Sequence, residues 1–167
     1  MSLPISKEEL ANRGKKAEAT VAKFFDKLKK ESATFDFQRQ YDARTARGRF
    51  PSQTGDYLVW RKLVQGSRLI GNFSAAIEVK TVAHDFRLPS KNFNSEQIAK
   101  LRRRQLAGCL PVVLVFHSTV KLWSCPPFLT FQSEPDAPSW DLTTWGSYAT
   151  AADALTDASP EIFGAHK

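Results

Sequence analysis

The chain has 167 residues, and its 24 basic and 17 acidic side chains give it a net charge of +7. This length fits a single domain, and the fractions of hydrophobic and charged residues are those of a globular protein. The longest apolar run has eight residues, which argues against a membrane protein. The N-terminus lacks a signal-peptide pattern and the chain has only two cysteines, which argues against a secreted scaffold and a zinc finger.

Two helices are predicted at the start of the chain. Ser6 and Glu9 form a capping box for a short helix over 6–12, which we expect Gly14 and the arginine before it to interrupt. Over 15–31, apolar residues then recur at three-to-four spacing, as in an amphipathic helix. The other face of this second helix is rich in lysine.

Strands are predicted next. Phe35 and Phe37 alternate with polar residues, and the arginine-rich stretch after them is expected to be a loop or a hairpin. The segments 56–64 and 73–80 are rich in β-forming residues, and 65–67 is a turn candidate between them. If a hairpin closes at that turn, the numbers of opposed residues sum to roughly 132–134.

The later part of the chain predicts a further helix and two strands. Asn94 or Ser95 can cap a helix over 96–107. The apolar run 111–117 fits a strand buried on both faces, and 121–125 is a candidate for one more strand. This order of elements predicts an α/β domain around a mixed sheet.

The C-terminal part differs in composition from the rest. We expect a domain over 1–130 and a C-terminal extension over 131–167, packed on the domain or at a subunit interface. Residues 1–121 hold 23 basic and 11 acidic side chains, a net +12, whereas 122–167 hold one basic and six acidic, a net −5. A basic body favours a polyanionic partner such as nucleic acid, although surface charge can also serve solubility alone.

The sequence Ile77-Glu78-Val79-Lys80 is the sharpest local feature. Residues two apart in a strand point to the same face, so Glu78 and Lys80 project together. A carboxylate suits Mg²⁺, and an ammonium group can stabilise negative charge that develops on a phosphate. The same spacing also occurs on ordinary solvated strands, so a catalytic interpretation needs support.

Three further residues offer that support. With the turn at 65–67, Asp56 comes within about two residues of Glu78, close enough for two carboxylates to share a metal. A competing turn at Gly71-Asn72 would break this register. Glu18 borders the apolar face of its helix, and Gln97 begins the later helix; each is a candidate site residue or an ordinary polar surface residue.

In combination, these segments resemble the PD-(D/E)xK nuclease superfamily, and within it the RecU-type Holliday junction resolvases. Asp56 and Glu78-Val79-Lys80 match the superfamily pattern. Asn12-Arg13-Gly14, leading into the helix with Glu18, resembles the opening of the RecU branch, and 86–98 resembles its segment after the lysine. The likeness spans about two-thirds of the chain; the 21 residues between Asp56 and Glu78 and the acidic tail depart from the family.

The resemblance implies a restriction-endonuclease-like α/β core, with a mixed central β-sheet flanked by helices. It implies a homodimeric, metal-dependent endonuclease that resolves four-way DNA junctions by paired phosphodiester hydrolysis, in a bacterial cell or a phage-infected host. Mg²⁺ is the implied cofactor, and Mn²⁺ is expected to substitute for it. The alternatives are a nuclease of this class that cuts duplex DNA, either restriction-type or general, and a non-catalytic DNA-binding domain.

The resemblance also implies roles for individual residues. The implied metal ligands are Glu18, Asp56, Glu78 and the main-chain carbonyl of Val79. Lys80 would position the attacking water and stabilise charge, and Gln97 would orient the water or the phosphate. The residues expected to bind DNA are Lys15, Lys16, Arg44, Arg47, Arg49, Arg102, Arg103 and Arg104.

Overall fold

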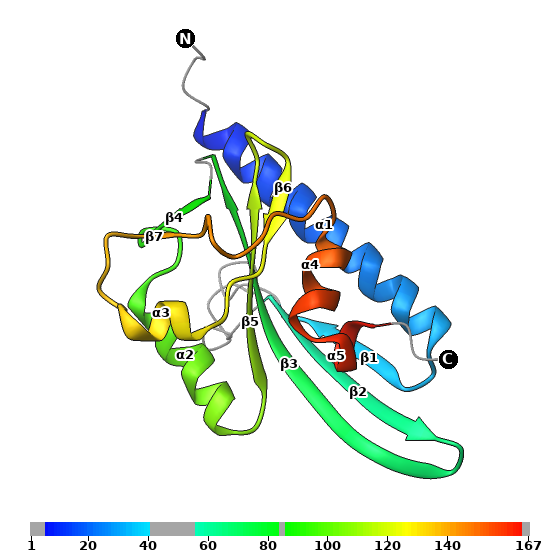
Figure 1. The fold of residues 1–167 in the computed structure, drawn as a ribbon. Coiled ribbons are helices and arrows are strands. Elements are labelled where there is room, and N and C mark those ends of the chain that lie inside the picture. Colours follow the sequence, from blue (N-terminus) through cyan, green and yellow to red (C-terminus); the bar gives the residue numbers. More distant parts are fainter. Residues whose placement is uncertain (1–5, 41–55, 84–85, 165–167) are drawn as a thin grey trace, which may run out of the picture.

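The computed structural model of this chain describes residues 6–40, 56–83 and 86–164, and a five-stranded sheet forms its centre (Figure 1). The strand order is β1-β2-β3-β5-β6, and only β3 and β5 pair in parallel. The strands are β1 (Phe35–Arg39), β2 (Tyr57–Gln65), β3 (Arg68–Val82), β5 (Leu110–His117) and β6 (Leu122–Ser124). A separate two-stranded sheet joins β4 (Arg87–Pro89) to β7 (Ser139–Asp141).

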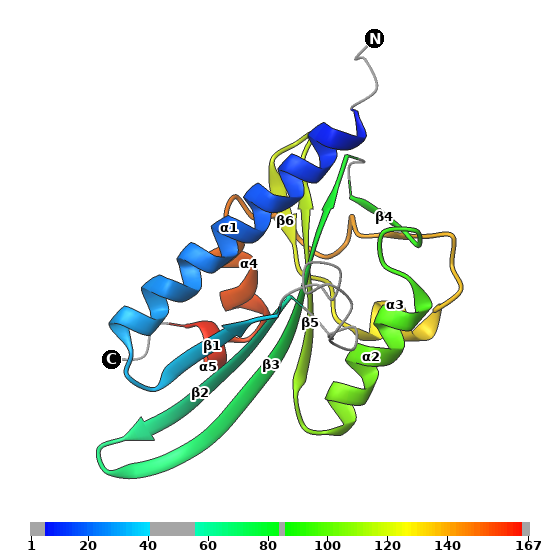
Figure 2. The ribbon, with the colours of Figure 1, turned by 180° about the vertical axis from the view of Figure 1, so that it is seen from behind.

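Helices cover both faces of the central sheet. The helices are α1 (Lys7–Glu31), α2 (Ser95–Leu106), α3 (Leu129–Ser133), α4 (Ala151–Ala158) and α5 (Pro160–Phe163). In two opposite views, α1, α4 and α5 lie to one side of β3 and β5, and α2 and α3 lie to the other (Figures 1 and 2). The expected fold class, a mixed α/β sheet flanked by helices, is confirmed. Among the described residues, no helix has the length and apolar character needed to cross a bilayer.

The two cores follow from the alternation of side chains along β3. Ile77 and Val79 pack into one core with the apolar stripe of α1, in which Phe25 is fully buried. Ala76 belongs to the other core, with Ile98 of α2. Because neighbouring residues of a strand point to opposite faces, the segment that carries Glu78 and Lys80 is held rigidly from both sides.

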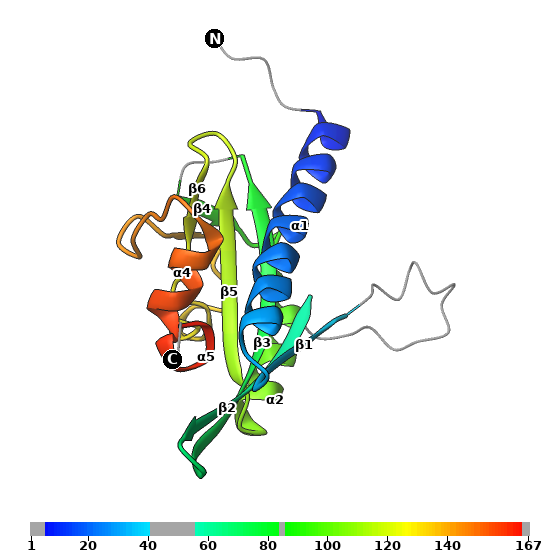
Figure 3. The same cartoon turned by 90° about the vertical axis from the view of Figure 1, so that its right-hand side faces the viewer.

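The hairpin of β2 and β3 has the expected register. Tyr57 is paired with Ile77, and the chain turns at Gly66, whose φ of +60° suits glycine. The competing turn is not used, because Gly71 lies inside β3, where a bulge next to it shifts the pairing by one residue. The hairpin extends beyond the other strands of the sheet (Figure 3).

The prediction of two separate N-terminal helices is wrong, because α1 runs without interruption through Gly14. Its N-cap is Ser6, whose hydroxyl accepts the Glu9 N–H at 3.1 Å. The side chain of Arg13 pairs with Glu9 at 2.6 Å and donates to the Ser118 hydroxyl at 3.1 Å. One glycine in a helix costs only about 1 kcal/mol, and tertiary contacts such as these offset that amount.

Replacing Gly14 with alanine should therefore stabilise the protein by about 0.5–1 kcal/mol. A Cβ at this position meets no heavy atom within 4 Å, so the substitution adds helix propensity without a clash. Urea unfolding would measure the gain. The reverse change at the exposed Ala19 of the same helix is the matched control and should lose a similar amount; a loss of stability in Gly14→Ala would contradict the expectation.

The helix predicted over 96–107 and the strands predicted over 111–117 and 121–125 are confirmed as α2, β5 and β6, whereas β4, β7, α3, α4 and α5 are not among the predicted elements. Asn94 is the N-cap of α2, and Gly108, with a φ of +85°, follows its end. The strand β5 lies between β3 and β6 and is almost completely buried, as its apolar sequence predicts. The arginine-rich stretch 44–49, expected to be a loop or a hairpin, lies outside the described residues.

Residues of the C-terminal extension enter both cores. The ring of Phe163 stacks on Phe25 with centroids 6.0 Å apart, and the buried Arg61 of β2 donates to the Ile162 carbonyl at 2.9 Å. On the opposite face of the sheet, Trp140 packs edge-on against Phe131 with centroids 5.2 Å apart.

Candidate active site

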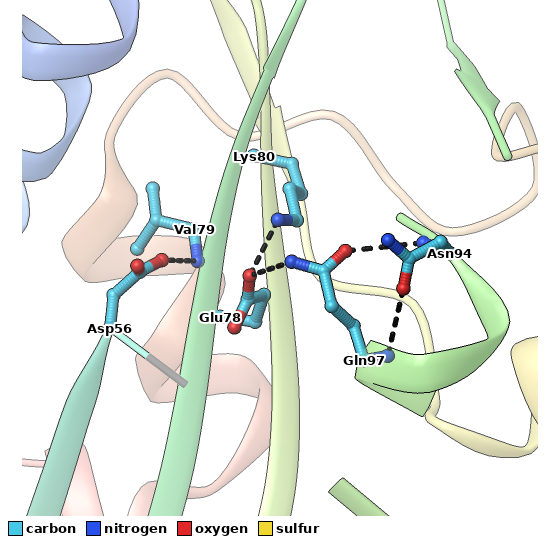
Figure 4. A network of polar contacts seen from close by, with 6 residues as sticks. All are labelled: Asp56, Glu78, Val79, Lys80, Asn94 and Gln97. Carbon is cyan, nitrogen blue, oxygen red and sulfur yellow. Dashed lines mark hydrogen bonds and ion pairs between the residues drawn. The ribbon is translucent and has the colours of Figure 1, made fainter. Parts of the chain in front are cut away.

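Two acidic residues lie opposite each other in the hairpin, just before β2 begins. The Asp56 N–H donates to the Ile77 carbonyl at 2.7 Å, which continues the β2–β3 ladder by one residue and sets Asp56 opposite Glu78. Oδ2 of Asp56 in turn accepts the Val79 N–H at 2.6 Å (Figure 4). The expectation that Asp56 lies within two residues of Glu78 across the hairpin is confirmed.

The Glu78 side chain is the centre of a small polar network. It is only 8% exposed, and its Oε1 accepts two hydrogen bonds, from Lys80 Nζ at 2.5 Å and from Gln97 Nε2 at 2.9 Å (Figure 4). The Lys80 side chain is 14% exposed. The structure thus brings together five of the predicted site residues, which come from β3, from α2 and from the residue just before β2; they are Asp56, Glu78, Val79, Lys80 and Gln97.

The first turn of α2 holds Gln97 through a complete capping box. The Asn94 side chain accepts the Gln97 N–H at 3.0 Å, and Gln97 Oε1 accepts the Asn94 N–H at 3.1 Å. The sequence predicts either Asn94 or Ser95 as the cap; the structure selects Asn94 and adds a link from this cap to the site that the sequence analysis does not contain. The signal was present, because an N-cap residue followed three positions later by glutamine is the pattern of a capping box.

Burial and the neighbouring Glu78 carboxylate raise the pKa of Asp56 to about 7. Two carboxylates in a shielded position repel one another, and a cation relieves that repulsion. The donors here are carboxylate oxygens and the Val79 carbonyl, which leaves the strand on the same side as the N–H that meets Asp56. Hard oxygen donors of this kind fit Mg²⁺.

Glu18 does not join this pair directly. Its carboxylate pairs with Arg39 at 2.5 Å, and its main-chain carbonyl accepts the Tyr57 hydroxyl at 2.9 Å. Arg39, expected in a loop or a hairpin, lies in β1, where it pairs with Tyr57 of the antiparallel strand β2. The negative charge of Glu18 still contributes to the raised pKa of Asp56. No group of three or more His, Cys, Asp or Glu side chains is placed to hold a metal in the part of the chain that the structure describes.

The predicted DNA-binding residues fall into two groups. Lys15 and Lys16 are exposed on α1, within one turn of Glu18. Arg102, Arg103 and Arg104 are exposed in the C-terminal half of α2, the helix whose N-terminus carries Gln97. Arg44, Arg47 and Arg49 lie outside the described residues.

Comparison with known proteins gives one solved structure to report. It is Hjc, a Holliday junction resolvase from the archaeal hyperthermophile Archaeoglobus fulgidus, 14% identical in sequence, with a TM-score of 0.49. The superposition covers 89% of this chain and 98% of that one. No family model and no curated protein matches the sequence.

Proposed function

We propose that this protein is a metal-dependent phosphodiesterase that acts on DNA. The observation that carries the proposal is the pairing of Asp56 with Glu78 across one hairpin, with Lys80 bonded to the same Glu78. Two shielded carboxylates beside an ammonium group suit the hydrolysis of a phosphodiester, which needs a cation, a positioned water and stabilisation of negative charge.

Within that class, we propose a four-way junction resolvase of the PD-(D/E)xK superfamily. The support comes from the order of sequence segments that resemble the RecU branch, from the basic body of the chain and from the exposed cationic side chains on α1 and α2. A homodimer would cut two strands related by a two-fold axis. Nicking of only one strand of a junction would argue against this arrangement.

Each residue of the site has a distinct part in the proposed mechanism. Asp56, the Glu78 carboxylate and the Val79 carbonyl would hold Mg²⁺, with Glu18 as a further predicted ligand. Held by these groups, Mg²⁺ would supply Lewis-acid chemistry for the hydrolysis of a phosphodiester. Lys80 Nζ orients the attacking water and stabilises negative charge on the phosphate as it develops. Gln97 keeps the Glu78 carboxylate in place through the bond from its Nε2.

The proposal is tested with a labelled four-way junction and a linear duplex of matched sequence, each with Mg²⁺, Mn²⁺ or EDTA. Wild-type protein should make paired symmetric nicks in the junction alone, and the nicks should be absent with EDTA and in Glu78→Gln. Equal cutting of the duplex would indicate a general or restriction-type nuclease. Tight junction binding without cutting under any condition would favour a non-catalytic DNA-binding domain.

Binding should depend on salt through the lysines of α1. Replacing Lys15 and Lys16 together with alanine should flatten the slope of log Kd against log salt by about two units, because each lost phosphate contact removes about one. Fluorescence anisotropy with a labelled junction in Ca²⁺ measures the slope. A double variant at Lys62 and Arg68, two exposed cations of the projecting hairpin, is the control with equal charge loss. If the slope flattens equally in the Lys15/Lys16 variant and in the Lys62/Arg68 variant, a specific role for α1 in DNA binding is contradicted.

A further inference from the structure

The dipeptide Phe93-Asn94, between β4 and α2, contacts both groups that donate to Glu78. We propose that it is the positioning element of the site. Phe93 holds the Lys80 ammonium and Asn94 holds the Gln97 carboxamide, so that both donate to Oε1 of Glu78 while Oε2 is left for a metal ion. The assignment of Oε2 to a metal rests on the proposed function; the two contacts themselves do not.

The main chain of Asn94 determines which end of the Gln97 carboxamide faces Glu78, and the Asn94 side chain keeps that N–H in place by accepting the Gln97 N–H. The Asn94 main-chain N–H is a donor only, so the Gln97 atom that it meets at 3.1 Å is the carbonyl oxygen, Oε1. The opposite end, Nε2, then points to Glu78 at 2.9 Å as a donor. A carboxamide turned the other way would lose both bonds. The bond from Gln97 N to the Asn94 side chain, at 3.0 Å, keeps the whole turn in register.

Phe93 acts on the second donor. Its ring is fully buried, and the Lys80 Nζ lies 5.8 Å from the ring centroid. A cation at this distance is attracted to the face of an aromatic ring, and partial burial strengthens the attraction. The ring is itself held edge-on by Phe131 and Trp140, with centroids 5.0 Å and 6.2 Å away. Trp140 belongs to the C-terminal extension, so that segment supports the site through Phe93.

Lys80 and Gln97 both donate to the same oxygen of Glu78, Oε1, and this leaves the other oxygen without a donor from either of them. Two donors at Oε1 restrain rotation of the Glu78 carboxylate and keep its second oxygen in one direction. Groups that orient a metal ligand in this way typically change metal affinity or activity about 10- to 100-fold when they are removed. Phe93 and Asn94 would therefore matter to the site without touching metal or DNA.

The test compares Asn94→Ala and Phe93→Leu with two controls remote from the site. Thr150→Ala removes the matching N-cap of α4, and Phe163→Leu removes an equally buried ring from the other core. Mn²⁺ binding is measured by calorimetry. DNA affinity is measured by fluorescence anisotropy in Ca²⁺, and the cleavage rate is measured under single-turnover conditions. Asn94→Ala and Phe93→Leu should each weaken Mn²⁺ binding about 10-fold and slow cleavage about 10- to 100-fold with DNA affinity unchanged. Asn94→Ser retains a side-chain oxygen that can accept the Gln97 N–H, so this variant should have Mn²⁺ affinity and a cleavage rate close to those of the wild-type protein.

The outcomes separate this inference from the proposed function. If the two site variants lose no more Mn²⁺ affinity than Thr150→Ala and Phe163→Leu, the positioning role is wrong even if the wild-type protein cuts DNA. If the wild-type protein binds Mn²⁺ but cuts no DNA, the proposed function fails, and the calorimetry still decides the positioning role. Wild-type protein that binds no Mn²⁺ would overturn both. Asn94 is exposed, so its variants keep the test decisive should Phe93→Leu not fold.

Discussion

Lys80→Ala should lower the single-turnover rate of DNA cleavage by about 10³-fold and leave DNA affinity nearly unchanged. The ammonium group of Lys80 lies beside Glu78 and is only 14% exposed, so its charge acts over a short distance with little screening by water. Water that enters the space left by the lost side chain does not replace a fixed positive charge. The loss should therefore fall on the chemical step and not on the binding of DNA, to which one shielded lysine contributes little.

A second lysine on the same hairpin provides the control for this variant. Lys62 of β2 is exposed, and the structure gives it no part in the site, so Lys62→Ala should cleave at the wild-type rate. Rates are measured with protein in excess over a junction and at saturating Mg²⁺, and affinity is measured in Ca²⁺. Normal cleavage by Lys80→Ala would remove this residue from the mechanism. A parallel loss of affinity would instead make it a DNA-binding residue.

Asp56→Asn should make the metal-free protein more stable at neutral and alkaline pH. Burial and the Glu78 carboxylate raise the pKa of Asp56 from 3.8 to about 7 in the folded protein. The folded state therefore binds a proton that the unfolded state has released, and stability falls as the pH rises from about 4 to about 7. Asparagine carries no charge, so the variant avoids this loss. We expect it to gain about 1–3 kcal/mol at pH 8 and nothing below pH 4.

The measurement is urea unfolding in EDTA at several pH values. Asp36→Asn is a matched control with the opposite sign, because the hydrogen bond from Lys29 at 2.6 Å lowers the pKa of Asp36. That control should lose stability at neutral pH. Added Mg²⁺ should stabilise the wild-type protein and reduce the advantage of Asp56→Asn. An equal gain for Asp56→Asn at pH 4 and pH 8 would show that the effect does not come from ionisation.

The Asp56–Glu78 pair lowers the stability of the fold in return for a site that suits a cation. Burial and the charge of Glu78 raise the pKa of Asp56, so this shielded pair costs stability in the absence of a cation, and in the proposed function the same pair would bind one. If Asp56→Asn is more stable than the wild-type protein and no longer cleaves DNA, this interpretation is supported. Active sites often contain groups that weaken the fold.

The sequence by itself predicted the part of the site that depends on local geometry. Alternation in β3 places Glu78 and Lys80 on one face, and a turn at Gly66 sets Asp56 opposite Glu78, because register in a hairpin follows from the turn and a period of two. The N-cap of α2 was likewise readable from Asn94 and its neighbours. Each of these features depends on residues close in the chain or on one turn.

Contacts between side chains of different elements depend on how the helices pack on the sheet. The bond from Gln97 to Glu78 and the approach of Lys80 to Phe93 depend on where α2 crosses the sheet, which no local pattern encodes. The pairing of Glu18 with Arg39 similarly depends on how α1 lies over β1. The expected interruption of the helix at Gly14 is absent because tertiary contacts also determine how far α1 extends. A local preference of about 1 kcal/mol is small beside the packing of a 25-residue helix, so tertiary contacts and not propensity set the extent of α1.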